Sequence, residues 1–439
     1  MTRTVCMFVT NSVNGDPRVR REAATLAKNG YQVVVIGLRG SGDCQEEWLD
    51  GFKVIRVEEP KLLTIRQGVL AALERLSPRL LVRVRSVYRL IRYGCRNPVV
   101  LQTRHEQGKS EAKPAMPLTA WQKTKTDQLS IRFITWLNVE MARVAIQQRA
   151  DLYHSHDLDT LLAGYLAKRR TGNPLLYDFH ELYTEQFPKG IKSPLWHFWY
   201  AGLEWILLRG TDYRITVCVS LGEWAARRYR VEPPVTVMNV PNARTVFRIP
   251  AQTSQEKVIL FHGMYMPDRG LERLIEAAQY IRGGRIVFRG FGSLEGRLRE
   301  LSRQAGVENV VSFKPPVPMA ELVEAAGDAD IGVIPYLPVC LNNEFCLPNK
   351  IFEYMMAGLA VVGSDLPELR RIILGHDVGL IYDPYSSKDL ARALNELLAD
   401  PARLEKMRRN ALQAAQDKFN WACESQKLLR LYDTAVGLA

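Results

Sequence analysis

The sequence lacks the features that mark several classes of protein. No apolar run reaches the roughly 20 residues that a transmembrane helix needs, and the first residues lead straight into a short strand pattern, so we expect no secretory signal. The seven cysteines are odd in number and include no C-x-x-C pair, which argues against a disulfide framework or a zinc site. These absences favour a protein of the reducing cytosol.

Acidic residues are also in deficit. The 47 Asp and Glu are outnumbered by 59 Lys and Arg, which gives a net charge of +12. Nine basic residues and one acid, Glu74, lie between Lys61 and Asn97, where apolar and basic residues interleave at helical spacing. A solvated basic face, a nucleic-acid site and a membrane-surface patch are the alternatives. We favour peripheral association of helices within 61–97 with an anionic membrane, at the inner face of the cell membrane, and expect no nucleic-acid partner because no nucleic-acid-binding module is present.

What the sequence does contain is an alternation of strands and helices, in a chain of 439 residues that suits two domains. Strands at 4–10, 31–37 and 52–57, with a helix opened by Pro17 after the first of them, predict a parallel sheet. We predict an α/β protein with these parts: a first domain at 1–240, with a mobile polar loop at 103–126; a proline-rich linker at 241–254; a second domain at 255–418; and a helix at 419–439 that returns to the first domain.

The most informative stretch runs from Asp330 to Gly363. A buried strand at 330–336 is followed by an irregular loop, a helix opened by Pro348 and a second buried strand at 360–363. A helix that starts beyond the carboxyl end of a parallel strand presents free N–H groups to an anion. Lys350 adds a full positive charge there, and Glu353 lies on the same helical face. A cation for phosphate and a carboxylate for a sugar diol would together hold a nucleotide sugar, although an exposed Lys–Glu pair of this spacing is also common on ordinary helices.

This stretch resembles the donor-binding motif of retaining glycosyltransferases of the GT-B fold, family 4, which is also called group 1. The pattern Pro-x-Lys-x-x-Glu-Tyr-Met-x-x-Gly is matched at Pro348, Lys350, Glu353, Tyr354, Met355 and Gly358. The family's first Glu departs from the pattern, because Glu344 lies nine positions before Glu353 rather than eight and Phe345 takes its place. The resemblance implies two Rossmann-like, doubly wound domains facing a central cleft. It also implies a ribose-binding role for Glu353 and a weaker sugar-contacting role for Glu344.

The resemblance extends to the turn after the first strand of the second domain. Family members place an Arg and a Lys there on the diphosphate, and here those positions hold Met264 and Arg269. One charge is therefore missing, while Arg269 can make bidentate phosphate contacts. The donor-binding residues that the resemblance and the glycine-rich turns imply are Gly15, Gly263, Arg269, Gly290, Gly292, Glu344, Phe345, Leu347, Pro348, Asn349, Lys350 and Glu353.

In the first domain, three polar residues follow predicted strands at the edge where ligands bind in open α/β sheets. His156 ends one strand and matches the second His of the family's His-x-His segment, which contacts hydroxyls of the donor sugar; His154 reads as mostly structural. His180 and Glu181 end the next strand and are acceptor-side candidates, with a local hydrogen-bonding role as the alternative. Asp157 and Asp159 open a helix and suit its N-terminus without a metal.

The implied function is transfer of a sugar from a nucleotide-diphosphate sugar, with uracil as the favoured base, to a hydroxyl of a glycan or lipid-linked acceptor in cell-surface polysaccharide or glycolipid synthesis. We assign the catalytic roles to His156, Arg269 and Lys350 and expect no cofactor and no metal. Two alternatives stay open, motivated by Met264 and the shifted Glu344. One is a non-catalytic scaffold at the membrane that binds a nucleotide sugar, and the other is a sugar-nucleotide epimerase of the same fold.

Overall fold

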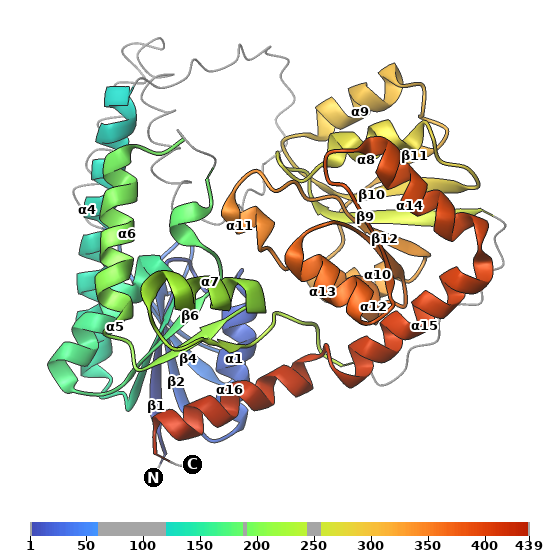
Figure 1. Ribbon diagram of the computed structural model, residues 1–439. Coiled ribbons are helices and arrows are strands. Elements are labelled where there is room, and N and C mark those ends of the chain that lie inside the picture. The colour runs from blue at the N-terminus through green and yellow to red at the C-terminus, as the bar shows by residue number, and fades with distance from the viewer. Residues whose placement is uncertain (1, 60–119, 188–190, 244–255, 438–439) are drawn as a thin grey trace. The chain divides into compact units, whose positions relative to one another are not determined.

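The computed structural model describes residues 2–59, 120–187, 191–243 and 256–437 (Figure 1). These residues form two compact units. The N-terminal unit comprises residues 1–215, 225–234 and 429–439, and the C-terminal unit comprises residues 216–224 and 235–428. Two helices, α7 (Val219–Tyr229) and α16 (Trp421–Ala435), have residues in both units.

The N-terminal unit is built on a mostly parallel sheet with the strand order β3-β4-β2-β1-β5-β6-β7. The pairs β1–β2, β2–β4, β1–β5 and β5–β6 are parallel, and β3 runs antiparallel to its neighbour, β4. Strands β1, β5 and β6 are buried along almost their whole length, as expected of central parallel strands. The elements are β1 (Thr4–Phe8), α1 (Pro17–Lys28), β2 (Gln32–Leu38), β3 (Glu46–Leu49), β4 (Phe52–Val57), α4 (Ala120–Gln147), β5 (Leu152–His156), α5 (Leu158–Thr171), β6 (Leu175–Phe179), the 3-10 turn η1 (Tyr183–Glu185), α6 (Pro194–Leu208) and β7 (Tyr213–Thr216).

Local chemistry sets the start of two helices of this unit. The Asp16 carboxylate accepts a hydrogen bond from the Val19 N–H, and Pro17 occupies the first turn of α1. The Ser193 hydroxyl accepts from the Trp196 N–H in the same way at the start of α6. Both helices therefore begin at a residue that satisfies an otherwise unpaired backbone donor.

The C-terminal unit has a fully parallel sheet with the order β11-β10-β9-β12-β13-β14. Its core joins Ile259, Phe261, Phe288, Val333 and Val362 from the sheet to the helices above it. The elements are β8 (Val235–Thr236), β9 (Lys257–Met264), α8 (Leu271–Ala278), β10 (Gly284–Phe291), α9 (Glu295–Gln304), β11 (Val311–Lys314), the 3-10 turn η2 (Met319–Glu321), α10 (Leu322–Ala326), β12 (Ile331–Ile334), α11 (Leu341–Glu344), α12 (Lys350–Met356), β13 (Ala360–Ser364), α13 (Pro367–Gly375), β14 (Gly379–Tyr382), α14 (Ser387–Ala399) and α15 (Pro401–Asp417).

The predicted α/β architecture with parallel sheets is confirmed, and one local prediction is wrong. Residues 120–126, taken as the end of a mobile loop, belong to the long helix α4. β7 ends at Thr216, and α7 begins at Val219. The segment 61–97, the rest of the loop at 103–119 and most of the linker, 244–255, lie outside the described residues.

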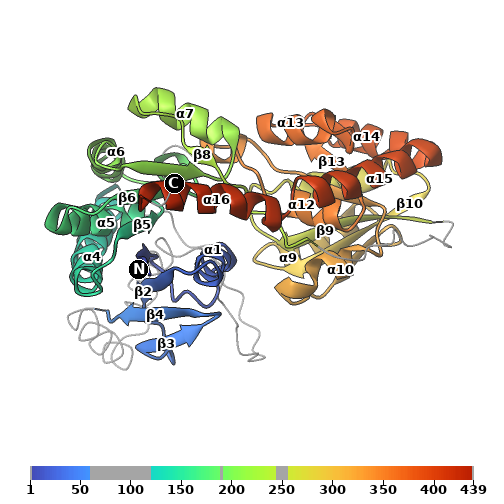
Figure 2. The ribbon, with the colours of Figure 1, turned by 90° about the horizontal axis from the view of Figure 1, so that it is seen from below.

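The first eleven residues after Leu428 belong to the N-terminal unit. The Tyr432 hydroxyl lies 2.6 Å from His154 Nδ1, and the Tyr31 hydroxyl donates to Asp433. Tyr31 and Tyr432 also meet edge to face. These contacts attach the end of α16 (red in Figure 2) to the sheet and to the loop before β2. Within the part of the chain that is described, no helix combines the length and the apolar character needed to cross a membrane.

Candidate active site

Three charged or aromatic side chains meet at the carboxyl ends of β9 and β12 in the C-terminal unit. Lys350, the first residue of α12, is buried, and its Nζ donates a 3.1 Å hydrogen bond to the Tyr336 hydroxyl. The Arg269 guanidinium lies over the same tyrosine ring, 4.2 Å from its centroid. Tyr336 therefore holds two cations beside each other, an arrangement that an anion with spread charge, such as a diphosphate, would stabilise.

Glu353 lies one turn further along α12 and has a partner that the sequence pattern did not reveal. Its Oε2 is 2.7 Å from Nε2 of His262, a buried residue of β9. The backbone N–H of His262 donates to the Tyr354 hydroxyl. With one oxygen oriented by the imidazole, the Glu353 carboxylate keeps Oε1 as an acceptor for a ligand.

Three of the predicted glycines are required by close approach. A Cβ on Gly263 would lie 3.2 Å from Lys350 Nζ, and the residue has a φ of 132°. A Cβ on Gly290 would lie 1.9 Å from the carbonyl oxygen of Gly263, so only glycine fits between β9 and β10 there. Gly292 is similarly crowded, against the backbone of Tyr265.

The other donor-side residues occupy the loop before α12. Glu344 is exposed at the end of α11, and the Phe345 carbonyl accepts from Cys218 Sγ. Leu347 and Pro348 are half-buried and Asn349 is exposed, and α12 begins at Lys350 with Asn349 as its N-cap residue. Because α12 has only seven residues, the charge at this point comes chiefly from the side chains of Lys350 and Arg269 rather than from a long helix dipole.

In the N-terminal unit, His156, Asp178 and His180 meet where β5 and β6 end. His180 Nε2 is 2.8 Å from Asp178 Oδ2 and 3.1 Å from His156 Nδ1. His156 Nδ1 is itself 3.3 Å from Asp178 Oδ2. A proton on His180 Nε2 can be donated to both Asp178 Oδ2 and His156 Nδ1. A second proton on His156 Nδ1 would point at the proton on His180 Nε2 and repel it. We therefore assign the His156 proton to Nε2, an atom with no hydrogen-bond partner among the described residues.

The surroundings of the two imidazoles, His156 and His180, shift their pKa values in opposite directions. Burial lowers the pKa of His156, which keeps its ring neutral. Burial also opposes the charged form of His180, but the carboxylates of Asp157 and Asp178 outweigh it and raise the pKa of His180 to about 10. His180 is thus a fixed cation at neutral pH, and His156 is a neutral ring that it orients.

Asp157 is the N-cap residue of α5 and Asp159 lies in its first turn, where the sequence predicts these carboxylates. Asp157 makes no side-chain cap and instead accepts from the His180 N–H, with a φ of 61° that is unusual for a residue other than glycine. Asp159 accepts from the Thr10 hydroxyl, and burial raises its pKa to about 7. Glu181 is half-buried next to His180, and Gly15 lies exposed in the turn before α1.

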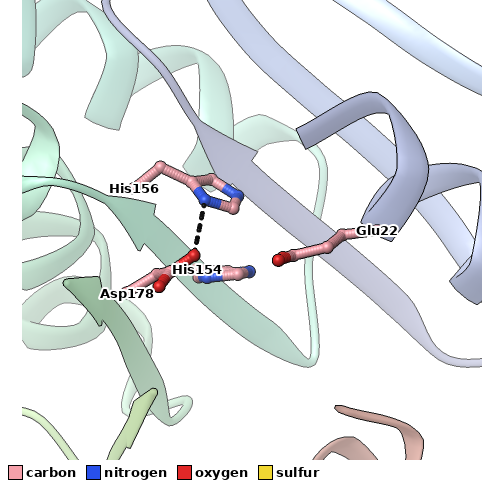
Figure 3. A group of neighbouring side chains, drawn as sticks. All are labelled: Glu22, His154, His156 and Asp178. Atoms are coloured by element: carbon pink, nitrogen blue, oxygen red, sulfur yellow. Dashed lines mark ion pairs between the residues drawn. The ribbon is translucent and has the colours of Figure 1, made fainter. Parts of the chain in front are cut away.

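His156 also belongs to a buried group of side chains with the composition of a metal site: Glu22, His154, His156 and Asp178 (Figure 3). No third ligand for the two histidines is evident in the sequence, because Glu22 comes from α1 and Asp178 from β6. The cluster already contains a cation, however. The Arg18 guanidinium contacts Asp178 through Nε at 2.9 Å and Nη2 at 3.0 Å, and its Nε lies 3.2 Å from Glu22 Oε1. Burial opposes ionised Asp178, but Arg18 and His180 hold its pKa well below the usual range.

The structure therefore gathers the predicted residues into two groups, each within one unit. Lys350, Glu353, Arg269, Gly263 and Gly290 form the first, and His156 and His180 form the second. The residues that sequence reasoning missed are His262, Tyr336, Arg18 and Asp178. His262, Tyr336 and Asp178 are polar or aromatic and lie within two residues of the end of a buried strand, which is the signal that could have found them. Arg18 lies in the first turn of α1, and no such signal marks it.

Comparison with known proteins agrees with this geometry. Two parallel-sheet α/β units of this kind define the GT-B fold. The chain matches the family described as glycosyl transferase 4-like domain over residues 15–243 and that described as glycosyl transferases group 1 over residues 243–414. The protein belongs to this group 1 glycosyltransferase family, so its class is that of the glycosyltransferases.

Curated relatives and solved structures are similar to the chain. A D-inositol 3-phosphate glycosyltransferase of Thermobispora bispora is 25% identical over 66% of this chain and 71% of its own length. One of Corynebacterium aurimucosum is 31% identical over 47% of this chain and 49% of its own. Among solved structures, a sucrose-phosphate synthase from Thermosynechococcus elongatus has a TM-score of 0.70 at 16% identity, covering all of both chains. Anabaena Alr3699/HepE in complex with UDP and glucose has a TM-score of 0.64 at 14% identity, over 98% of this chain and all of its own.

Proposed function

We propose that the protein is a retaining glycosyltransferase that moves a sugar from a nucleotide-diphosphate sugar, with UDP-sugars favoured, to a hydroxyl of a glycan or lipid-linked acceptor. The observation that carries this proposal is the pairing of Lys350 and Arg269 on Tyr336 beside the Glu353–His262 pair. The UDP complex of the similar Anabaena protein supports the choice of base.

The two cations would act on the leaving group. When the bond between the anomeric carbon and the diphosphate breaks, negative charge grows on the phosphate oxygens. Lys350 is buried, and its position is fixed by Tyr336, so its charge is available without reorganisation. Arg269 lies over the same ring and can offer two N–H groups to one phosphate. We propose that these side chains make a divalent metal unnecessary and compensate for the methionine at position 264.

Glu353 is proposed to bind the ribose hydroxyls. Its side chain is 18% exposed, and His262 fixes the carboxylate oxygen that faces the strand. His262 Nδ1 has no partner among the described residues, so its proton can remain on Nε2, where it donates to Glu353. A carboxylate held in this way gives up little freedom on binding a diol.

His156 is proposed to donate Nε2–H to a hydroxyl of the donor sugar. A buried donor without a partner costs free energy, which a ligand that accepts its hydrogen bond would recover. Retention of configuration follows from the family resemblance; attack on the same face as the departing diphosphate, with its phosphate oxygen as base, would achieve it. His180 and Glu181 are proposed to contact the acceptor, because they follow a strand at the ligand-binding edge of the sheet. The cationic state of His180 suits a phosphate-bearing acceptor.

The test is nucleotide release from UDP-, GDP- and ADP-sugars, with and without a membrane lipid extract or inositol 3-phosphate, each in the presence and absence of EDTA. We expect release from one donor that depends on one acceptor and persists in EDTA. Release without any acceptor, together with a changed sugar, would establish the epimerase. Tight donor binding without turnover under every condition would establish the non-catalytic scaffold. Product stereochemistry by NMR decides retention.

A further inference from the structure

Helix α6 presents a continuous apolar surface. Of the thirteen large apolar side chains that are exposed among the described residues, five lie on this one helix. They are Leu195, Phe198, Trp199, Trp205 and Ile206, with exposed fractions from 38% to 80%. At 100° per residue they fall within an arc of about 120°, so they form one stripe along the helix rather than scattered positions. We call these five residues the α6 stripe.

The opposite side of α6 is well anchored. Trp196, Tyr200, Glu204 and Leu207 are buried there, and the helix packs on α4 and α5, beside which it is seen in Figure 1. The Glu204 carboxylate accepts from the Tyr229 hydroxyl. The exposure of the stripe therefore does not come from a poorly packed helix. A single helix with large apolar side chains on both sides is expected to cover its second side with a partner.

The charges around the stripe indicate the partner. The only charged residue within α6 is Glu204, which is buried, so the stripe carries no acid. An exposed cation stands just beyond the C-terminal end of the helix. The Arg209 guanidinium lies 3.5 Å from the centroid of the Trp205 ring, whereas Lys192, before the helix, is paired with Asp127 and lies over the buried Trp196. Tryptophan and phenylalanine beside a basic residue are a composition that inserts into the headgroup region of anionic bilayers.

We infer that the α6 stripe is a membrane-docking surface that inserts into an anionic lipid bilayer. A second copy of the chain is the alternative occupant, but two copies with a net charge of +12 each repel one another, whereas an anionic surface attracts the chain. This inference does not depend on the proposed donor or acceptor. It also differs from the membrane association predicted for segment 61–97, because it rests on residues of a described helix.

The experiment is sedimentation of the full-length protein with vesicles of phosphatidylcholine alone or mixed with 30% phosphatidylglycerol. The test variant is Phe198→Ser/Trp205→Ser/Ile206→Ser, whose three side chains are exposed and absent from the core. The control is Trp48→Ser, because Trp48 is a 67% exposed tryptophan that stands alone on β3 of the same unit. Circular dichroism and the thermal midpoint establish that both variants fold.

We expect the wild type and Trp48→Ser to bind the anionic vesicles equally, and the triple variant to bind at least about tenfold more weakly. Quenching of tryptophan fluorescence by brominated lipid should fall with the removal of Trp205 and not of Trp48. Equal vesicle binding by all three proteins would overturn the inference. So would a wild type that ignores vesicles and sediments as a dimer that the triple substitution dissociates.

Discussion

Substitution of His180 by glutamine tests the charge state that the N-terminal site depends on. Glutamine keeps a side chain that can donate to Asp178 but removes the titratable ring. The wild-type imidazole lies 2.8 Å from Asp178 Oδ2 and 3.3 Å from Asp157 Oδ2, and its pKa is raised to about 10 by these two carboxylates against the opposing effect of burial. In the unfolded chain the pKa of histidine is about 6.5.

The sign and size of the effect follow from linkage. A pKa that is raised in the folded state stabilises the fold at pH values below the unfolded pKa, and this contribution is lost as the pH rises through the folded pKa. With values of about 6.5 and about 10, the contribution falls by roughly 2 kcal/mol between pH 8 and pH 9.5. Burial raises the pKa values of Glu22 and Asp159 to about 7, so both are largely ionised at pH 8. Their titration therefore adds little to the change in stability between pH 8 and pH 9.5.

The assay is scanning calorimetry of wild type and His180→Gln at four pH values from 8 to 9.5. We expect the wild-type midpoint for the N-terminal unit to drop by roughly 4–8 °C more than that of the variant, from about 2–4 °C per kcal/mol for a unit of this size. His376→Gln is the matched control, because burial lowers the pKa of His376 and it carries no charge in this range. Parallel wild-type and His180→Gln curves would show that His180 is not a buried cation.

Three further predictions concern the C-terminal unit. Lys350→Ala and Glu353→Ala should each weaken donor binding, measured by calorimetry, by about 1.5–3 kcal/mol, and unchanged affinity in both would reject the donor site. Tyr336→Phe keeps the ring but removes the hydroxyl that accepts from Lys350 Nζ at 3.1 Å, so donor affinity should fall by about 1 kcal/mol; no change would mean that the hydroxyl does not position the cation. Gly290→Ala should destabilise the unit by more than about 2 kcal/mol in urea unfolding, because the new Cβ would lie 1.9 Å from a carbonyl oxygen of β9. Gly296→Ala, where nothing lies within 4 Å, is its control and should stabilise by up to about 1 kcal/mol.

Much of the C-terminal site could be predicted because its chemistry is local in sequence. Pro348, Lys350 and Glu353 fall within six residues, and strand, loop, helix and strand follow one another without interruption. The partners of these side chains could not be predicted in the same way. His262 lies 91 positions before Glu353 and reaches it because parallel pairing of β9 and β12 brings their ends together. No periodicity within one segment contains that information.

The N-terminal site was less predictable for the same physical reason. His156 and His180 were recognised as strand-end residues, but the distance between their rings depends on the parallel register that pairs His156 with Asp178. The same register places Asp178 against Arg18, which comes from α1 and is 160 positions away. Asp157 shows the limit of a local rule. It is the N-cap residue of α5, yet its carboxylate makes no cap hydrogen bond and instead contacts the backbone N–H and the ring of His180, on the next strand.

The buried cluster of Figure 3 allows a last prediction, about metal. Its two histidines and two carboxylates could ligate zinc, but Arg18 already occupies Asp178 with two hydrogen bonds and contacts Glu22, so a divalent ion would have to displace a buried guanidinium. We therefore expect EDTA or added zinc to leave the thermal midpoint unchanged. Arg18→Met should cost about 3–5 kcal/mol of stability, because it leaves buried carboxylates without their cation. A wild-type midpoint that falls in EDTA and recovers with zinc would mean that the metal, and not Arg18, neutralises Asp178.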